Sequence, residues 1–214
     1  MVQNYAAVPA SIRQLHLHIT ISVDIMCVHS LPFLVKVSQR LKFTTPMFIK
    51  SWKRPQLITG ITKVIQSYAK YVFLVNFINS DNKFEAIRDD LPEVVLNINA
   101  EEEHVPEAEQ KNRVIKERTR VVRHTLPFRK ITENMVIRMV IFSVFWLNSF
   151  PVSASVSGNL RPTTIITGRM IYFSVHCNLE FGAYTQVHEY DRPRNSEEAC
   201  TLEAVCLGPS DNIQ

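Results

Sequence analysis

The chain of 214 residues carries a formal net charge of +4, and its 46% hydrophobic and 21% charged residues are typical of a folded protein rather than of a disordered tail. Its 5 glycines all stand apart along the chain, which excludes P-loop and dinucleotide-binding folds and a nucleotide cofactor. The most apolar run, 139–147, is much shorter than the about 20 residues of a membrane span, so we expect no transmembrane segment.

Three consecutive strands are predicted near the start of the chain. Apolar and polar residues alternate over 14–28, which is the pattern of a long, half-buried strand. Two further apolar stretches, 31–38 and 41–45, follow after short breaks. Three strands joined by short connections indicate an antiparallel meander.

A helix and two more strands follow the meander. Pro55 suits the first turn of a helix, and apolar residues then recur at three- and four-residue spacing from Ile58 to Val72. The nearly all-apolar stretch 72–78 predicts a strand that is covered on both faces. A short helical piece over 84–91 leads to a short strand over 94–98. These elements predict an α/β protein with a mixed, five-stranded sheet flanked by helices.

Two helices and an irregular region make up the rest of the chain. The first helix begins at Pro106 and ends before Pro127, and the second, strongly apolar one occupies 132–150. Serine, glycine, proline and threonine make 153–168 look irregular, and short strands are predicted at 184–188 and 204–207. We therefore expect a core of residues 14–150 and a small C-terminal β extension of residues 151–214.

Three acidic residues occupy positions that suggest chemistry. Asp24 interrupts the first strand, where β-propensity disfavours aspartate, although a solvent-facing side chain would explain it if it stood alone. Asp81 follows the end of a buried strand, where ligands bind in α/β sheets, although turns also favour aspartate. Glu109 lies in the first turn of a predicted helix, where the helix dipole favours negative charge.

Basic residues continue along the helix face that begins at Glu109. Helical spacing places on this face Arg113, Lys116, Arg120 and Arg123. A carboxylate at one end of a basic row suits a metal-binding group beside a track for nucleic-acid phosphates, and such binding weakens as salt rises. A solvated face with a Glu–Arg pair one turn apart is the alternative for this row taken alone.

The order of the three acids favours the functional interpretation. An acid in the first strand, one after the fourth and one on the helix after the fifth is the layout of ribonuclease H-like polynucleotidyl transferases. Three converging carboxylates can hold two divalent cations about 4 Å apart, of which one activates the attacking oxygen and the other stabilises the leaving one. Mg²⁺ prefers oxygen ligands, which explains carboxylates in place of histidine or cysteine.

Five segments carry a more specific resemblance. They are VDIMCVHSLPFLVKVSQRLKF (23–43), HVPEAEQKNRVIKERTRVVRHTLPF (104–128), FWLNSFP (145–151), RPTTIITGR (161–169), and FGAYTQVHE (181–189) with AVCLGP (204–209). Together they resemble the integrase region of Ty1/copia-type retrotransposon polyproteins, from about residue 19 to the end of the chain.

This resemblance implies a site and an activity. It makes Asp24, Asp81 and Glu109 the catalytic acids and the ligands of two Mg²⁺ or Mn²⁺ ions, with Glu107 as a weaker candidate for the third acid. The implied enzyme is a DDE-type integrase, a nucleotidyltransferase that processes DNA 3′ ends and transfers them into target DNA. It also implies DNA as partner and a homo-oligomeric active form, with phosphate contacts from Arg113, Lys116, Arg120 and Arg123.

The chain departs from the family pattern in ways that keep a second hypothesis open. Lys83 stands where the family has glycine, Gln110 stands where it has arginine, and Asp81 and Glu109 are closer in sequence than usual. The alternative is a decayed integrase remnant that at most binds nucleic acid. Residues 1–10 lack the basic start and apolar run of a secretory signal, so we do not expect secretion. The implied chemistry needs access to chromosomal DNA, which predicts a nuclear or cytoplasmic location.

Overall fold

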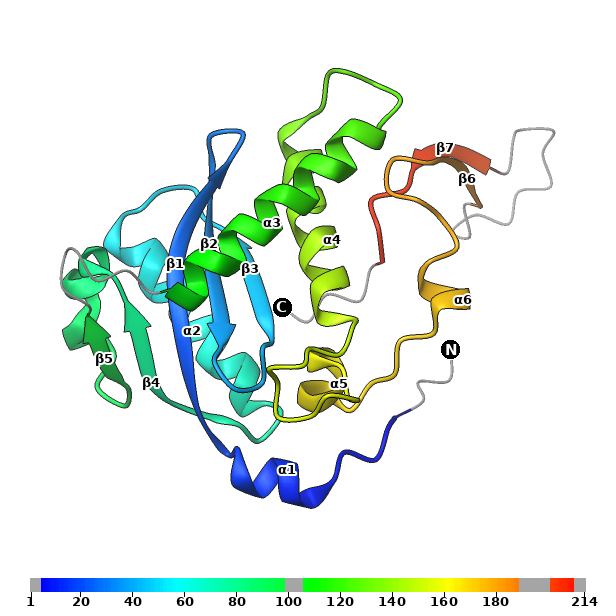
Figure 1. Ribbon diagram of the computed structural model, residues 1–214. Coiled ribbons are helices and arrows are strands. Elements are labelled where there is room, and N and C mark those ends of the chain that lie inside the picture. Colours follow the sequence, from blue (N-terminus) through cyan, green and yellow to red (C-terminus); the bar gives the residue numbers. More distant parts are fainter. Residues whose placement is uncertain (1–4, 99–105, 189–200, 210–214) are drawn as a thin grey trace, which may run out of the picture.

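A five-stranded mixed sheet forms the centre of the molecule in the computed structural model, which describes residues 5–98, 106–188 and 201–209 (Figure 1). The sheet has the strand order β3-β2-β1-β4-β5, with β1 antiparallel to β2, β2 antiparallel to β3, and β4 parallel to both β1 and β5. The strands are β1 (His18–Val28), β2 (Leu31–Ser38), β3 (Thr44–Phe48), β4 (Leu74–Ser80) and β5 (Val95–Ile98). The predicted meander and mixed sheet are confirmed.

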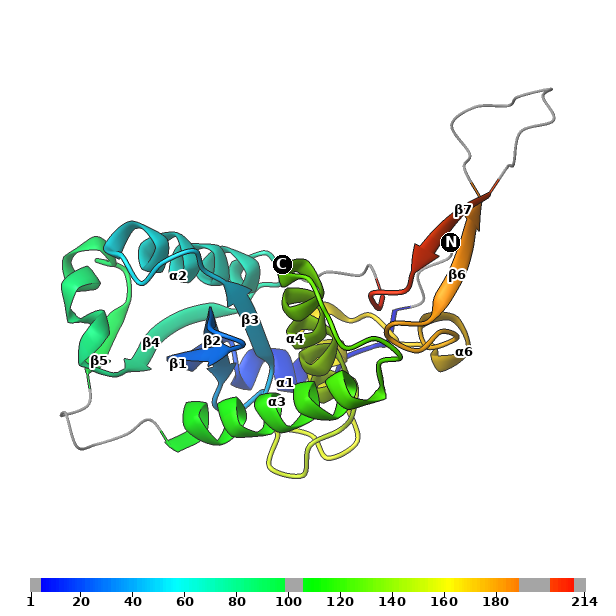
Figure 2. The same cartoon turned by 90° about the horizontal axis from the view of Figure 1, so that it is seen from above.

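Helices cover both faces of this sheet. Figure 2 shows α2 on one side of the sheet and α3 on the other, and α4 packs beside α3 along β3. The helices are α1 (Ala10–Leu15), α2 (Arg54–Ala69), the 3₁₀ helix η1 (Asn82–Asp90), α3 (Pro106–Thr125), α4 (Glu133–Asn148), α5 (Pro162–Thr167) and α6 (Phe173–His176). Among the described residues, no helix is long and apolar enough to cross a membrane.

Two hydrophobic cores lie on the two faces of the sheet, and β1 contributes to both. Ile21 and Val23 belong to the core beneath α2, whereas Met26 and Val28 belong to the core beneath α3 and α4. Side chains alternate between the faces of a strand, so Asp24, two residues before Met26, faces α3. The long α3 helix therefore passes over the strand that carries this carboxylate (Figure 1).

The structure differs from the sequence prediction at several elements. β1 begins at His18 rather than at residue 14, because Ala10–Leu15 forms the short helix α1, and β3 is Thr44–Phe48 rather than 41–45. The prediction that the fourth strand is covered on both faces was wrong, since Leu74 is 46% exposed and Phe77 is 44% exposed.

The region expected to be irregular contains a helix. α5 begins with Pro162 in its first turn and ends at Gly168, whose φ of 71° is a left-handed conformation that favours glycine. Every residue of α5 is buried, and Ile165 and Ile166 join the core beneath α2. Part of the C-terminal region thus packs against the main sheet.

The C-terminal region also forms a separate two-stranded ribbon. β6 (Tyr184–His188) pairs antiparallel with β7 (Thr201–Val205), which confirms a small β element in the extension but places its second strand before the predicted 204–207. The ribbon projects away from the rest of the molecule (Figure 2). The domain boundary at residues 150 and 151 stays a prediction.

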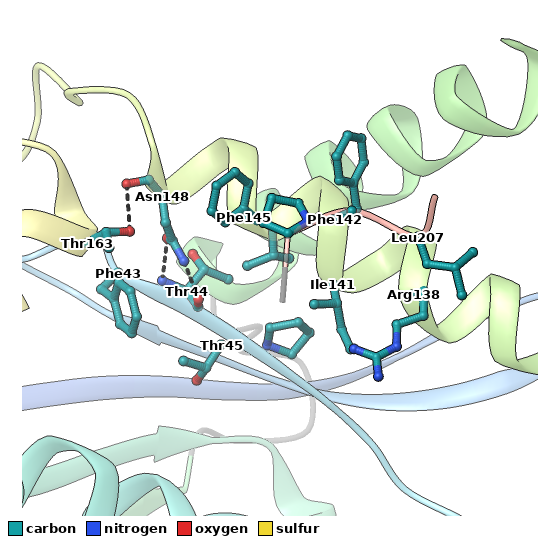
Figure 3. A pocket seen from close by; sticks show the side chains of 14 residues that line it. Phe43, Thr44, Thr45, Arg138, Ile141, Phe142, Phe145, Asn148, Thr163 and Leu207 are labelled. Carbon is teal, nitrogen blue, oxygen red and sulfur yellow. Dashed lines mark hydrogen bonds between the residues drawn. The ribbon is translucent and has the colours of Figure 1, made fainter. Parts of the chain in front are cut away.

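Asn148, the last residue of α4, joins that helix to β3. Its Nδ2 donates to the Thr44 carbonyl at 2.7 Å and its Oδ1 accepts from the Thr44 amide at 2.9 Å, while its own carbonyl accepts from Thr163 Oγ1 at 3.1 Å (Figure 3). All three residues are buried. One side chain therefore satisfies two backbone groups that water does not reach.

Replacing Asn148 by Ala is expected to lower the free energy of unfolding by about 2–4 kcal/mol, because two buried backbone groups lose their partners. Urea denaturation followed by circular dichroism measures this loss. Asn97, whose Nδ2 donates to Asn79 Oδ1 at 3.1 Å in an exposed pair, provides the matched control. An Asn148→Ala variant no less stable than Asn97→Ala would contradict the role given to Asn148.

Lys36 of β2 is buried on the face of the sheet that α2 covers. It is 2% exposed on β2, opposite Val23 on β1 and Thr45 on β3, and it faces α2. Burial, with a smaller contribution from the positive charge of Lys63, lowers the pKa of Lys36 from 10.5 to about 7. No described residue forms an ion pair with it.

Replacing Lys36 by Met is expected to stabilise the fold by about 2–4 kcal/mol at pH 7, since each unit of pKa shift corresponds to about 1.4 kcal/mol. A lowered folded-state pKa means that the ammonium costs free energy at and below about pH 7, and that this cost disappears as the pH approaches 10.5. Denaturation of both proteins at pH 7 and pH 10 measures the difference, which should shrink at the higher pH. A less stable Lys36→Met variant would be inconsistent with this account.

Candidate functional site

Asp24 of β1 and Glu109 of α3 line the same open cavity. The cavity has a volume of about 440 Å³ and runs along the exposed side of α3. The other side chains of interest that line it are Asn112, Arg113, Lys116, Glu117 and Arg120. Two of the three predicted acids and three of the four predicted basic residues are thus brought together.

The Asp24 carboxylate is held by two hydrogen bonds. Asn112 Nδ2 donates to Oδ2 at 2.7 Å, and the Ile25 amide donates to Oδ1 at 2.7 Å. Partial burial raises the pKa of Asp24, and the negative charges of Asp81 and Glu109 raise it further, whereas the Ile25 amide and the charge of Lys83 act in the opposite direction. The three acids are therefore near enough to interact electrostatically, and a cation beside Asp24 would relieve their repulsion.

Asp81 follows β4 directly and begins η1. Its Oδ1 accepts from the Lys83 amide at 3.2 Å, and its Oδ2 lies 3.0 Å from the Lys83 ammonium. The same ammonium stands 5.6 Å from the centre of the Trp52 ring. Asp81 does not belong to the lining of the Asp24 cavity, and its charge is paired with Lys83.

The two glutamates at the start of α3 have different surroundings. Glu107 forms an ion pair with Lys42, with Oε1 and Nζ 2.5 Å apart, and both side chains are about one-fifth exposed at 20% and 21%. Glu109 lies on the cavity lining with Asp24. The resemblance makes Glu109 the third acid and Glu107 a weaker candidate. Of the two, Glu109 is the one that shares a cavity with Asp24.

The basic residues of α3 fall into two groups. Arg113, Lys116 and Arg120 are exposed along the cavity, although Arg113 Nε also lies 3.1 Å from Glu117 Oε1. Arg123 lies outside the cavity lining, and its guanidinium donates to the carbonyls of Phe128 and Arg129 in the loop after α3. The predicted track is therefore continuous up to Arg120, while Arg123 binds the protein's own backbone.

Asn112 is a site residue that sequence reasoning missed. It is 7% exposed, and its Oδ1 has no hydrogen-bond partner among the described residues. Its position three residues after Glu109 places it on the same side of the helix, which was a usable signal. The sequence pattern did not indicate Asn112, because the pattern was built from charged side chains.

The donor chemistry suits a hard divalent cation, since two carboxylates and one unsatisfied amide oxygen lie together. Within the described ranges, however, no three acidic, histidine or cysteine side chains are arranged to hold a metal ion. The second acid, Asp81, is instead paired with the Lys83 ammonium. Release of that pair would be needed for all three carboxylates to act together.

Comparison with known proteins identifies the fold. No known family matches the sequence, and no curated protein matches it. Among solved structures, the chain is similar to the catalytic core domain of BIV integrase, with a TM-score of 0.50 and 17% identity over 69% of this chain and 92% of that one. The chain therefore has an integrase-like α/β fold.

Proposed function

We propose that this chain is the catalytic core of a Ty1/copia-type integrase that processes DNA 3′ ends and joins them to target DNA. The observation that carries the proposal is the meeting of Asp24, Glu109 and a basic helix face at one cavity. The integrase-like fold and the five sequence segments support it. A homo-oligomeric active form belongs to the same proposal.

In this proposal, Asp24, Asp81 and Glu109 would hold two Mg²⁺ or Mn²⁺ ions. When bound, such ions activate the attacking oxygen and stabilise the leaving one in phosphodiester chemistry. The Asn112 amide orients Asp24 through its 2.7 Å hydrogen bond. Lys116 and Arg120 provide positive charge along α3 for DNA phosphates, and their exposure leaves them accessible to a duplex.

A strand-transfer assay tests the proposal. The full chain is mixed with a labelled DNA duplex that carries a terminal 3′-hydroxyl, a target plasmid, and Mg²⁺ or Mn²⁺. The expected result is metal-dependent joining of label to plasmid, which chelation abolishes. DNA binding without any joined product under either metal would instead favour the decayed remnant.

Lys83 is the residue that favours the remnant hypothesis. Its ammonium lies 3.0 Å from Asp81 Oδ2, where it competes with a divalent cation for that carboxylate. The pair is partly exposed, with side-chain exposures of 55% and 33%, so the competition is modest in strength.

Replacing Lys83 by Ala is therefore expected to tighten Mn²⁺ binding by about three- to fivefold, which corresponds to the about 1 kcal/mol or less of an exposed ion pair. Isothermal titration calorimetry of Mn²⁺ into the two proteins measures the change. Lys83→Arg keeps the positive charge and is the matched control, for which no tightening is expected. Equal Mn²⁺ affinities of Lys83→Ala and the unmodified chain would show that Lys83 does not compete at this site.

A further inference from the structure

A second cavity lies at the β3 edge of the sheet, between α2, β3 and α4. Its volume is about 580 Å³, and it shares no lining residue with the Asp24 cavity. Three lysines line it: Lys36 from β2, Lys63 from α2, and Lys70, which directly follows α2. The described residues of its lining include these three lysines and no carboxylate.

Lys36 is the buried member of this cluster. Its 2% exposed side chain contributes to the cavity wall, and it forms no ion pair with the described part of the chain. A largely buried ammonium without a counter-charge is unfavourable, because burial removes much of its hydration. An anion in the cavity would supply that counter-charge.

Thr45 places a hydroxyl next to this ammonium. It is the register partner of Lys36 across β2 and β3, so both side chains stand on the same face of the sheet. The Thr45 Oγ1 is buried and has no partner among the described residues. Lys63 and the C-cap residue Lys70 are two helical turns apart, which places both residues on the side of α2 that lines the cavity.

The remaining walls are mainly apolar. Met47 and Phe48 of β3, Val64 of α2, and Ile137 and Ile141 of α4 complete them. Thr45 and Ile141, which also line the small neighbouring pocket, can be located in Figure 3. A ligand that fits these walls has an anionic head beside Lys36 and an apolar body.

We propose that this cavity is a binding site for a small phosphate monoester with an apolar substituent, whose phosphate is held by Lys36, Lys63 and Thr45. Lysine ammonium groups bind phosphate as point charges, and a hydroxyl donor completes the oxygen contacts. The site is separate from the proposed DNA-joining centre, and it does not depend on the activity of that centre.

Calorimetric titration of phenyl phosphate into the full chain tests the site, with phenol and inorganic phosphate as comparison probes. Phenyl phosphate is expected to bind saturably at one site, more tightly than either comparison probe. Lys36→Met, which preserves a folded core, is expected to weaken binding at least tenfold, and Lys63→Met severalfold. Lys130→Met removes an exposed lysine outside the cavity and should leave the affinity unchanged.

Two further measurements locate the ligand. Amide resonances of Thr45 and Ser67, which line the cavity, should shift on titration, whereas those of Lys116 should not. Proton uptake on binding at pH 8 is expected, because the phosphate restores the charge of Lys36, whose pKa is about 7 without a ligand. Absence of saturable binding, or equal affinity of Lys36→Met and the unmodified chain, would overturn the proposal.

Discussion

Asp24→Asn is expected to reduce strand transfer by about a thousandfold or more, because the loss of metal coordination removes several kcal/mol of transition-state stabilisation. The fold should survive. An asparagine at this position still accepts the Ile25 amide hydrogen bond with its oxygen. Its NH₂ can be met by the unsatisfied Asn112 Oδ1 after a turn of that amide group.

The stability of Asp24→Asn provides a control independent of activity. The folded-state pKa of Asp24 is raised above 3.8, mainly by burial, so the folded protein loses stability as the pH rises through the interval between the unfolded and folded pKa values. The neutral variant avoids this loss and should be slightly more stable at pH 7, with the difference vanishing below about pH 4. Thermal denaturation at both pH values measures it.

Metal-dependent stabilisation completes the test of Asp24. Mg²⁺ or Mn²⁺ should raise the melting temperature of the unmodified chain, because a ligand that binds only the folded state stabilises it, and should leave Asp24→Asn unaffected. Full strand transfer by a folded Asp24→Asn variant would refute the assignment of this carboxylate to the active centre.

A comparison of Glu109→Gln with Glu107→Gln separates the two candidate third acids. Glu109→Gln is expected to reduce strand transfer as strongly as Asp24→Asn does, since Glu109 shares the cavity with Asp24. Glu107→Gln is expected to retain most of the activity and to lose only the ion pair with Lys42, worth about 1 kcal/mol or less at this partly exposed position. The two variants carry the same glutamate-to-glutamine change, at positions two residues apart on α3, so each is a control for the other.

The readouts for this pair are strand transfer and Mn²⁺ binding, measured on variants whose melting temperatures have been compared first. A loss of activity confined to Glu107→Gln would reverse the assignment and require Glu107 to exchange Lys42 for a cation. Loss in neither variant would place the third ligand elsewhere.

The regular periodicity of the sequence made much of the fold predictable. β2 was predicted at its observed bounds, Leu31–Ser38, because an apolar strand is flanked there by clear breaks. Alternation alone did not reveal that the helix α1 extends to Leu15, since the few residues of overlap are too short to distinguish a strand from a helical turn. α5 was missed despite Pro162 and Gly168 at its ends, because serine and threonine around it suggested a loop.

The site was predictable only in part, because its geometry depends on contacts between distant segments. The placement of Asp24 beneath α3 follows from strand parity, but the 2.7 Å bond from Asn112 joins residues 88 positions apart. The pairing of Asp81 with Lys83 depends on a side-chain conformation at the start of η1. Likewise, Lys36 gave no sign of burial, since a lysine in a strand is usually expected to face solvent.

The hydrogen bonds between Asn148 and Thr44 also affect whether the edge strand β3 can pair with a strand of another copy of this chain. Backbone groups that point away from β2 recur at every second residue of β3, which places them at Thr44, Pro46 and Phe48. The Thr44 groups are already bonded to Asn148, and proline has no amide hydrogen to donate. A strand from another molecule therefore finds no free backbone donor at Thr44 or Pro46, which hinders edge-to-edge pairing along the first part of β3.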